Sequence, residues 1–189
     1  MKTIYIMLTR TGSMVSKIVS FFTKTKYTHA SLAFDEDLVE LYSSGRKKGM
    51  KMFPAGPTKE SLYRGFFGVK PFVPCAIYEL TVSEEVYEKA KQEISFFIEH
   101  IDEYKFSALG IIACKLNIAW ERKNKYFCSQ FVAEILTRSG AVEFGKPNCL
   151  IHPRDYQNLK CLNKIYEGTI ADIRRKIEEK EAVTAGVHS

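Results

Sequence analysis

The sequence predicts an α+β domain in which a mostly antiparallel sheet packs against helices. Short segments rich in β-branched and aromatic residues alternate with longer segments whose apolar residues recur at helical spacing. Two of the strand-like segments are separated only by Asp35-Glu36-Asp37, which favours a tight antiparallel hairpin. The chain has 189 residues, of which 46% are hydrophobic and 26% charged, so we expect one globular domain spanning 1–189.

The first quarter of the chain is expected to form the hairpin and its neighbours. Lys2–Thr9 is rich in β-branched and aromatic residues and predicts a strand. Ser13 is a suitable cap for a helix ending near Lys24, because apolar residues follow it at helical spacing. Thr28–Phe34 and Leu38–Tyr42 predict the two strands of the hairpin.

The segment from Ser44 to Cys75 carries much of the charge of the chain. It holds seven basic residues and a single acid, Glu60, so its net charge of +6 equals the excess of the whole chain. Four prolines and five glycines without clear periodicity predict a long basic loop over 44–75. Such a loop could attract an acidic substrate or make peripheral contact with an anionic membrane, but a merely solvated lysine-rich loop would look the same.

A strand and a long helix are expected next. Ala76–Val82 has the composition of a strand. Ser83 then occupies an N-cap position, and Glu84 and Glu85 lie in the first turn, where the helix dipole favours acids. One apolar stripe continues from there, so a helix is predicted over Ser83–His100.

The last third of the chain is expected to be largely helical. Phe106–Ala119 is apolar and compatible with either helix or strand, whereas Phe127–Ser139 has the spacing of an amphipathic helix. Ile165–Glu167 is a candidate short strand. Thr169–Lys180 predicts a polar amphipathic helix within a C-terminal helical extension over 168–189.

The composition also indicates the cellular compartment of the protein. Five cysteines are too few for a disulfide scaffold and are odd in number, so we expect reduced thiols. The apolar start of the chain is interrupted by Arg10, and no apolar run approaches the ~20 residues of a membrane span. These features predict a cytoplasmic protein.

Cys128 is the first candidate for chemistry. It opens the predicted helix Phe127–Ser139, and a thiol at a helix N-terminus is close to unpaired N–H groups and the positive end of the dipole. The backbone N–H groups of Cys128 and Ser129 could stabilise an oxyanion during acyl transfer. A buried cysteine that only fills space would have the same sequence signature.

His29 and Glu40 are the candidate base and orienting acid. His29 lies in a strand otherwise made of small and apolar residues, which is a rigid platform for a general base. Glu40 lies on the strand expected to pair with that of His29, where its carboxylate could fix the imidazole tautomer. Alternatively, His29 is a structural residue and Glu40 simply faces outward. Candidate substrate contacts are Arg46, Lys47, Lys48 and Tyr126.

Metal and nucleotide chemistry have little support in the sequence. Cys149, His152 and Cys161 are conceivable ligands, but their spacing matches no zinc pattern and no Cys-x-x-Cys pair is present. Neither a Gly-x-Gly-x-x-Gly motif after a strand nor a phosphate-binding loop is found. We therefore expect no metal and no cofactor.

Three segments together resemble the permuted papain-like branch of the NlpC-type cysteine peptidase superfamily, the YiiX/YaeF-like group. The first segment runs from Ser16 to Lys24 and continues through Tyr27–Ala33, the second is Glu40–Arg46, and the third is Tyr126–Val132. In that family the order along the chain is histidine, polar orienter and cysteine, the reverse of the cysteine-first order in ordinary papain-like enzymes. The family often has Glu where this chain has Gln130.

The resemblance implies a circularly permuted papain-like fold and a Cys128–His29–Glu40 triad. It also implies amide hydrolysis through a thioacyl intermediate, with a peptide, a cell-wall-derived peptide or another small amide as substrate. One rival function is lipid-directed acyl transfer, as in the related lecithin:retinol acyltransferase-like branch. Another is a non-enzymatic module that binds a polyanion through the basic loop. Nucleic acid is not expected as a partner, and the oligomeric state is left open.

Overall fold

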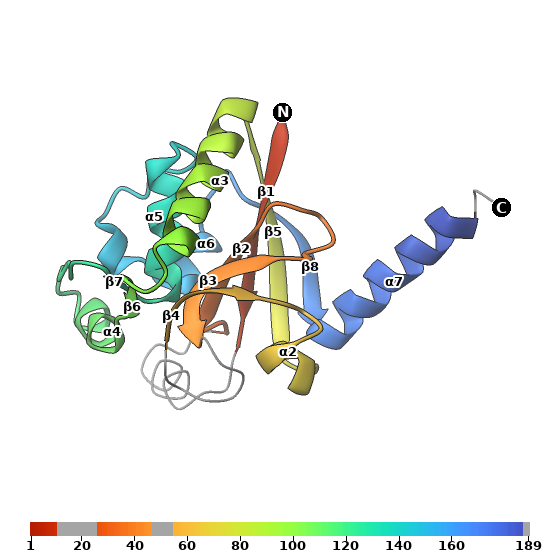
Figure 1. The fold of residues 1–189 in the computed structure, drawn as a ribbon, viewed down its shortest axis with the longest axis horizontal. Coiled ribbons are helices and arrows are strands. Elements are labelled where there is room, and N and C mark those ends of the chain that lie inside the picture. The colour runs from red at the N-terminus through yellow and green to blue at the C-terminus, as the bar shows by residue number, and fades with distance from the viewer. Residues whose placement is uncertain (11–25, 47–54, 187–189) are drawn as a thin grey trace.

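The computed structural model describes residues 1–10, 26–46 and 55–186 of the chain. It has the predicted α+β architecture, with helices packed against a six-stranded antiparallel sheet (Figure 1). The helix expected between Ser13 and Lys24 lies outside the described residues, as do the candidate substrate contacts Lys47 and Lys48.

The sheet has the strand order β4-β3-β2-β1-β5-β8. Its strands are β1 (Lys2–Thr9), β2 (His29–Ala33), β3 (Leu41–Arg46), β4 (Ala55–Glu60), β5 (Pro74–Val82) and β8 (Asn163–Thr169). The first strand lies in the interior of the sheet and pairs along its length with β2 and β5. Thr9 of β1 is opposite both His29 and Cys75, so these three residues mark one end of the sheet.

Helices and short elements complete the fold. The helices are α2 (Gly65–Val69), α3 (Glu84–Glu99), α4 (Ala108–Lys115), α5 (Cys128–Arg138), α6 (Pro153–Tyr156) and α7 (Ile170–Gly186), with a 3₁₀ turn η1 (Asn148–Leu150). The short strands β6 (Lys105–Phe106) and β7 (Lys125–Tyr126) pair in parallel before α4 and α5. Helices α3 and α5 lie on one side of the sheet, and α7 extends away on the other (Figure 1).

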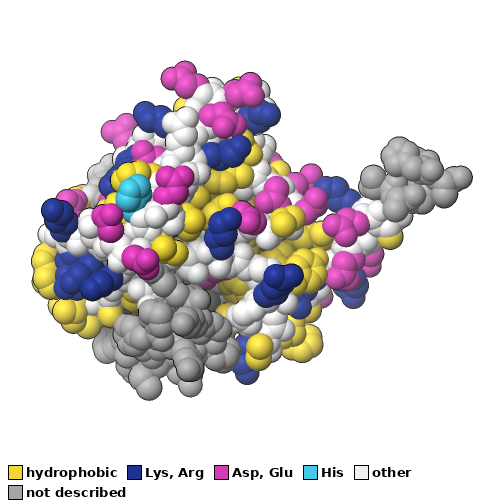
Figure 2. Space-filling view, in the orientation of Figure 1, with side chains coloured by type: hydrophobic (Ala, Val, Ile, Leu, Met, Phe, Trp, Pro, Cys, Tyr) yellow, Lys and Arg dark blue, Asp and Glu magenta, His cyan; other side chains and the backbone are white. Residues whose placement is uncertain are grey.

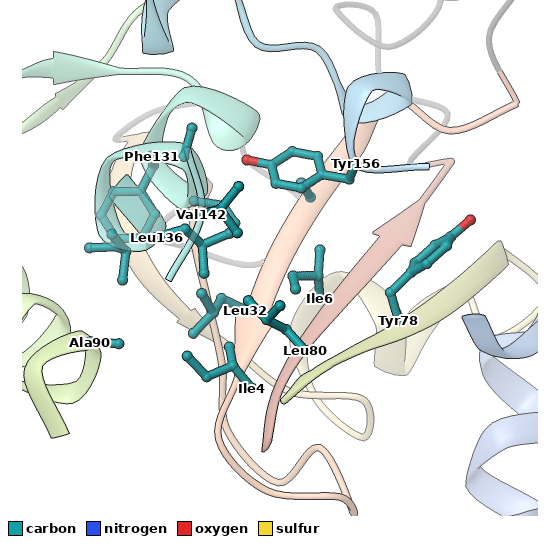
Figure 3. Close-up of a cluster of buried hydrophobic side chains, with 14 of the residues drawn as sticks. Ile4, Ile6, Leu32, Tyr78, Leu80, Ala90, Phe131, Leu136, Val142 and Tyr156 are labelled. Carbon is teal, nitrogen blue, oxygen red and sulfur yellow. The ribbon is translucent and has the colours of Figure 1, made fainter. Parts of the chain in front are cut away.

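Two apolar clusters cover the two faces of the sheet. The larger one joins alternate residues of β1, including Ile4 and Ile6, to Phe131 of α5 (Figure 3). The smaller one joins the intervening Met7 to Ile173 of α7. Because successive side chains of a strand point to opposite faces, β1 must be apolar on both, which explains its nearly continuous apolar sequence.

The long helix begins as the sequence predicted. The side chain of Ser83 accepts a hydrogen bond from the Val86 N–H at 3.2 Å, and Glu84 and Glu85 lie in the first turn of α3. Both features satisfy or stabilise the free N–H groups at the start of the helix. The predicted helix near the C-terminus is also present and continues to Gly186.

The basic segment differs from the expected loop, because it contains an edge strand and a helix. Strand β4 pairs with β3 and places Pro57 opposite Ser44, a position that proline tolerates at the edge of a sheet. The guanidinium of Arg174 in α7 then donates hydrogen bonds to the carbonyls of Leu62 and, at 2.8 Å, Phe67. The segment after β4 is thus attached to the body of the protein.

The hairpin is displaced from the predicted strand boundaries. The second strand was expected at Leu38–Tyr42, but β3 starts only at Leu41. Leu38 has a φ of 52°, and the Val39 N–H donates to the Asp35 side chain at 2.7 Å, so the turn includes residues that the pattern assigned to the strand. This displacement changes which residue of β3 lies opposite His29.

None of the helices in the described part of the chain combines the length and the apolar character that a membrane-spanning segment needs.

A pair of adjacent phenylalanines in α3 tests the larger apolar cluster. Phe97 is fully buried against Tyr104 and Phe131, whereas its neighbour Phe96 is 45% exposed. We expect Phe97→Ala to lower the free energy of unfolding by about 3–5 kcal/mol, and Phe96→Ala by less than about 1 kcal/mol. Urea unfolding of the two variants measures the difference, and equal losses would contradict this packing.

Candidate functional site

Cys128 occupies the first position of α5. The preceding Phe127 is extended, with φ −93° and ψ 168°, and its side chain is buried, so the chain turns sharply into the helix at the cysteine. The first N–H groups of a helix lack intrahelical acceptors and point out of its N-terminal end. Cys128 is therefore located where backbone donors and the positive end of the helix dipole coincide.

His29 opens β2 beside this helix end. Its Nε2 is 2.9 Å from Oε1 of Glu60 and 3.1 Å from Oε2. The Cys128 thiol lies 3.9 Å from the Thr28 carbonyl, to which it donates, and Cys128 is close enough to His29 to raise the pKa of the imidazole. Since Nε2 is engaged by the carboxylate, Nδ1 is the ring nitrogen left for the thiol. Both His29 and Cys128 are buried, at 8% and 7% exposed, so their interaction is only weakly screened by water.

Glu60, the last residue of β4, is fixed by two partners. Besides His29, it accepts a 2.6 Å hydrogen bond from the Ser31 hydroxyl at Oε2. Ser31 lies on the same strand as His29, two residues later. A carboxylate held in this way sets the tautomer and the orientation of the imidazole, which is the role of the acid in a nucleophile–histidine–acid triad.

Glu40 does not take this position, and the prediction that it orients His29 is wrong. Its carboxylate instead accepts hydrogen bonds from the Tyr42 hydroxyl and, at 2.9 Å, from the Lys59 ammonium. Strand β3 pairs Tyr42 with Leu32, so the antiparallel register brings His29 opposite Gly45 and leaves Glu40 beyond the far end of the strand. Sequence reasoning missed Glu60, although it is the one acid in the basic segment.

The position opposite His29 is occupied by a glycine, Gly45, which lies beside the contact between Glu60 and His29. Strand β3 separates β4 from β2, so the Glu60 carboxylate reaches His29 across it. A Cβ atom on Gly45 would lie 3.5 Å from Glu60 Oε1 and 3.6 Å from His29 Cε1. Both distances are ordinary van der Waals contacts, so the main chain of β3 passes directly beside the His29–Glu60 pair.

The surroundings of His29 favour its charged form. Burial is the largest influence on its pKa and lowers it, but the Glu60 carboxylate and the Cys128 side chain outweigh burial and raise the pKa from 6.5 to about 10. The Glu60 carboxylate acts through its negative charge and through its hydrogen bond to Nε2. The imidazolium therefore predominates at neutral pH and carries a proton that it can donate.

The first turn of α5 is held rigidly. The Ser129 hydroxyl donates to the Ile151 carbonyl at 2.7 Å, and the Tyr156 hydroxyl donates to the Ser129 carbonyl at 2.7 Å. Ser129 and Tyr156 are both buried. The predicted oxyanion donors, the N–H groups of Cys128 and Ser129, thus belong to a fixed piece of backbone, as electrostatic stabilisation of a transition state requires.

Of the predicted substrate contacts, Arg46 and Tyr126 lie within the described residues, and their positions differ from each other. Arg46 ends β3, next to Gly45 opposite His29. The ring of Tyr126 packs against Phe97, with centroids 5.5 Å apart, and its carbonyl accepts a hydrogen bond from Ser44 at 2.7 Å. Tyr126 therefore supports the loop that leads into α5, and its aromatic ring belongs to the core.

A second thiol–imidazole pair lies nearby. Sγ of Cys114 is 3.4 Å from Nε2 of His152. Burial raises the pKa of Cys114 to about 12 and lowers the pKa of His152, so both groups are uncharged at neutral pH. The Asp155 carboxylate accepts from the His152 backbone N–H at 2.7 Å and is not an acceptor for its ring. The pair lacks a carboxylate like that of Glu60, which raises the pKa of His29.

Metal binding by the histidine, cysteine and acidic side chains has no support in the geometry of the described residues. Within residues 1–10, 26–46 and 55–186, no three His, Cys, Asp or Glu side chains are grouped to hold a metal ion. The trio Cys149, His152 and Cys161 therefore forms no ligand set. All five cysteines are free.

Comparison with known proteins identifies no family for this chain. No protein-family model matches the chain, and a search of curated proteins finds no match either.

The contact between Glu60 and His29 should contribute to the free energy of unfolding, and this contribution should decrease as the pH rises. Because the folded pKa of His29 exceeds 6.5, the contribution of the charged pair is complete below about pH 6.5 and is lost as the pH rises through about 10. We expect the stability difference between the wild type and Glu60→Gln to be largest near about pH 6 and to shrink as the pH rises. Urea unfolding at several pH values measures it.

Glu40→Gln is the matched control for this measurement. The Tyr42 hydrogen bond, followed by the Lys59 contact, lowers the pKa of Glu40, so its carboxylate stays ionised throughout the range. Its stability difference should remain constant between about pH 6 and pH 9. A Glu60→Gln difference that is equally constant would show that the His29–Glu60 charge pair does not form.

Proposed function

We propose that this protein is a cysteine hydrolase that cleaves an amide bond through a Cys128–His29–Glu60 triad. The observation that supports this most strongly is the geometry around His29, whose Nε2 lies 2.9 Å from Glu60 and whose pKa is raised by both Glu60 and the neighbouring Cys128. Nucleophile, base and orienter are thus connected in series, as nucleophilic catalysis requires.

Acylation uses the charged form of the pair. The Cys128 thiolate attacks the carbonyl carbon of the substrate, and the carbonyl π electrons move onto oxygen to give a tetrahedral oxyanion. The N–H groups of Cys128 and Ser129 are positioned to bind that oxyanion. The carbon–nitrogen bond then breaks, His29 gives its proton to the leaving amine, and a thioester remains on Cys128.

Deacylation returns the enzyme to its starting state. His29, now neutral, accepts a proton from a water molecule as the water oxygen attacks the thioester carbonyl. The carbon–sulfur bond breaks, the carboxylic acid leaves, and the Cys128 thiolate and the His29 imidazolium form again. Glu60 keeps the ring oriented and stabilises its positive charge in both half-reactions.

The proposed substrate class comes from the family resemblance. The order along the chain is His29, Glu60, Cys128, the histidine-first order of the permuted papain-like group. By that resemblance we propose a peptide, a cell-wall-derived peptide or another small amide as substrate. The free state of all five cysteines supports a reducing compartment such as the cytoplasm.

Selective alkylation tests the reactive thiol. At about pH 7, iodoacetamide should modify Cys128 well before Cys75 and Cys114, because burial raises the pKa of each of those two thiols to about 12. His29→Ala should slow modification of Cys128 by about ten-fold or more. Peptide mapping by mass spectrometry follows each thiol. Unchanged alkylation of Cys128 in His29→Ala would contradict the proposed pair.

Acyl transfer from an activated ester tests catalysis before the natural substrate is known. We expect p-nitrophenyl acetate to acetylate Cys128 in a burst, which intact mass spectrometry detects, and Cys128→Ala to show no burst. Glu60→Gln should reduce turnover on the order of 10²-fold or more, because the imidazole loses its orienting carboxylate. Glu40→Gln should retain turnover within about two-fold. Equal losses in these two glutamate variants would reject Glu60 as the third member of the triad.

A further inference from the structure

An apolar surface with a basic rim lies on and after α4. Leu109, Ile112 and Leu116 follow one another at helical spacing and share one side of the helix. Ile118 and Trp120 are two further exposed apolar residues in the segment directly after α4. Each of these five residues, here called the α4 face, is at least 46% exposed. A large contiguous apolar surface on a soluble domain marks an interaction site.

The charge around the α4 face indicates the kind of partner. Between residues 105 and 125 there are five basic residues and one acid, Glu121, which gives this stretch a net charge of +4. The guanidinium of Arg122 lies over the Trp120 ring, 4.7 Å from its centroid. The basic residues are Lys105, Lys115, Arg122, Lys123 and Lys125. An apolar face that includes a tryptophan and has a cationic margin complements an anionic bilayer surface.

A second, smaller surface of the same composition lies near the same end of the molecule. Val69 and Phe72, at and after the end of α2, are exposed, and the basic residues Arg64 and Lys70 accompany them without an acid between residues 61 and 72. Helices α4 and α2 both lie toward the lower edge of the molecule in Figure 1, and hydrophobic and basic side chains are visible at both places in Figure 2.

We infer that the α4 face docks on the surface of an anionic lipid bilayer. The apolar side chains of α4 and Trp120 would enter the region between headgroups and acyl chains, while the basic rim contacts the acidic headgroups. This is peripheral binding through one side of a short helix, and it does not depend on the cysteine chemistry proposed above. Binding would orient the end of the sheet that carries His29 toward the lipid.

The single tryptophan of the chain reports directly on this contact, because Trp120 is part of the α4 face. With vesicles of phosphatidylcholine and phosphatidylglycerol, we expect the fluorescence of Trp120 to shift to shorter wavelength and the protein to sediment with the vesicles. Pure phosphatidylcholine vesicles should bind much less, and added salt should release the protein from the anionic vesicles. Cys128→Ala should bind as the wild type does.

Two matched pairs of substitutions distinguish binding through the α4 face from an effect of net charge alone. Leu116 and Val39 are 67% and 66% exposed, but Val39 lies on the hairpin between β2 and β3. We expect Leu116→Glu to weaken vesicle partitioning at least about ten-fold, and Val39→Glu to change it little. Likewise, Lys123→Glu should weaken binding about five-fold or more, whereas Lys89→Glu on α3 should not.

Three results would overturn the inference. The first is no sedimentation and no shift of Trp120 fluorescence with anionic vesicles. The second is an equal loss of binding in Leu116→Glu and Val39→Glu, which would reduce the effect to net charge. The third is a fluorescence shift that appears with rising protein concentration in the absence of vesicles and is abolished by Leu116→Glu. That result would show that a second copy of the chain covers the α4 face.

Discussion

The contact between Glu60 and His29 is the constraint on which the rest of the site depends. It joins two strands that are not neighbours, because β3 lies between β4 and β2. The carboxylate reaches the imidazole beside Gly45 of β3, and the Ser31 hydroxyl holds its second oxygen. The edge strand of the sheet is therefore part of the site, and its pairing with β3 determines whether the histidine is charged.

The two thiol–imidazole pairs show what that carboxylate contributes. In each pair the thiol lies close to the imidazole and away from water, yet burial keeps Cys114 and His152 neutral. Only the second pair has a carboxylate on the far side of the ring, and there the pKa of the histidine rises. Proximity of a thiol to an imidazole is thus insufficient for an ion pair. A buried counter-charge offsets the cost of desolvating the imidazolium.

The sequence was informative where local rules decide the outcome and misleading where pairing between strands decides it. The Ser83 cap and the position of Cys128 at the start of α5 depend on neighbouring residues, and both were predictable. The partner of His29 depends on how β2 and β3 are paired. The hairpin turn includes Leu38, which has a positive φ, so the pairing differs from the one expected from the sequence. A signal for Glu60 did exist, since a single acid among seven basic residues is unusual, but β4 itself contains glycine and proline and was not recognisable as a strand.

The distribution of charge connects the α4 face to the candidate site. Residues His29, Thr9 and Cys75 mark one end of the sheet, and the pairing of Lys2 with Val82 marks the other. The acidic first turn of α3 begins just after Val82, at the end opposite the site. An anionic surface would therefore repel that end while it attracts the basic rim of the α4 face, so charge alone would favour one orientation. In that orientation the end of the sheet that carries His29 faces the lipid surface, and the acidic start of α3 faces away from it.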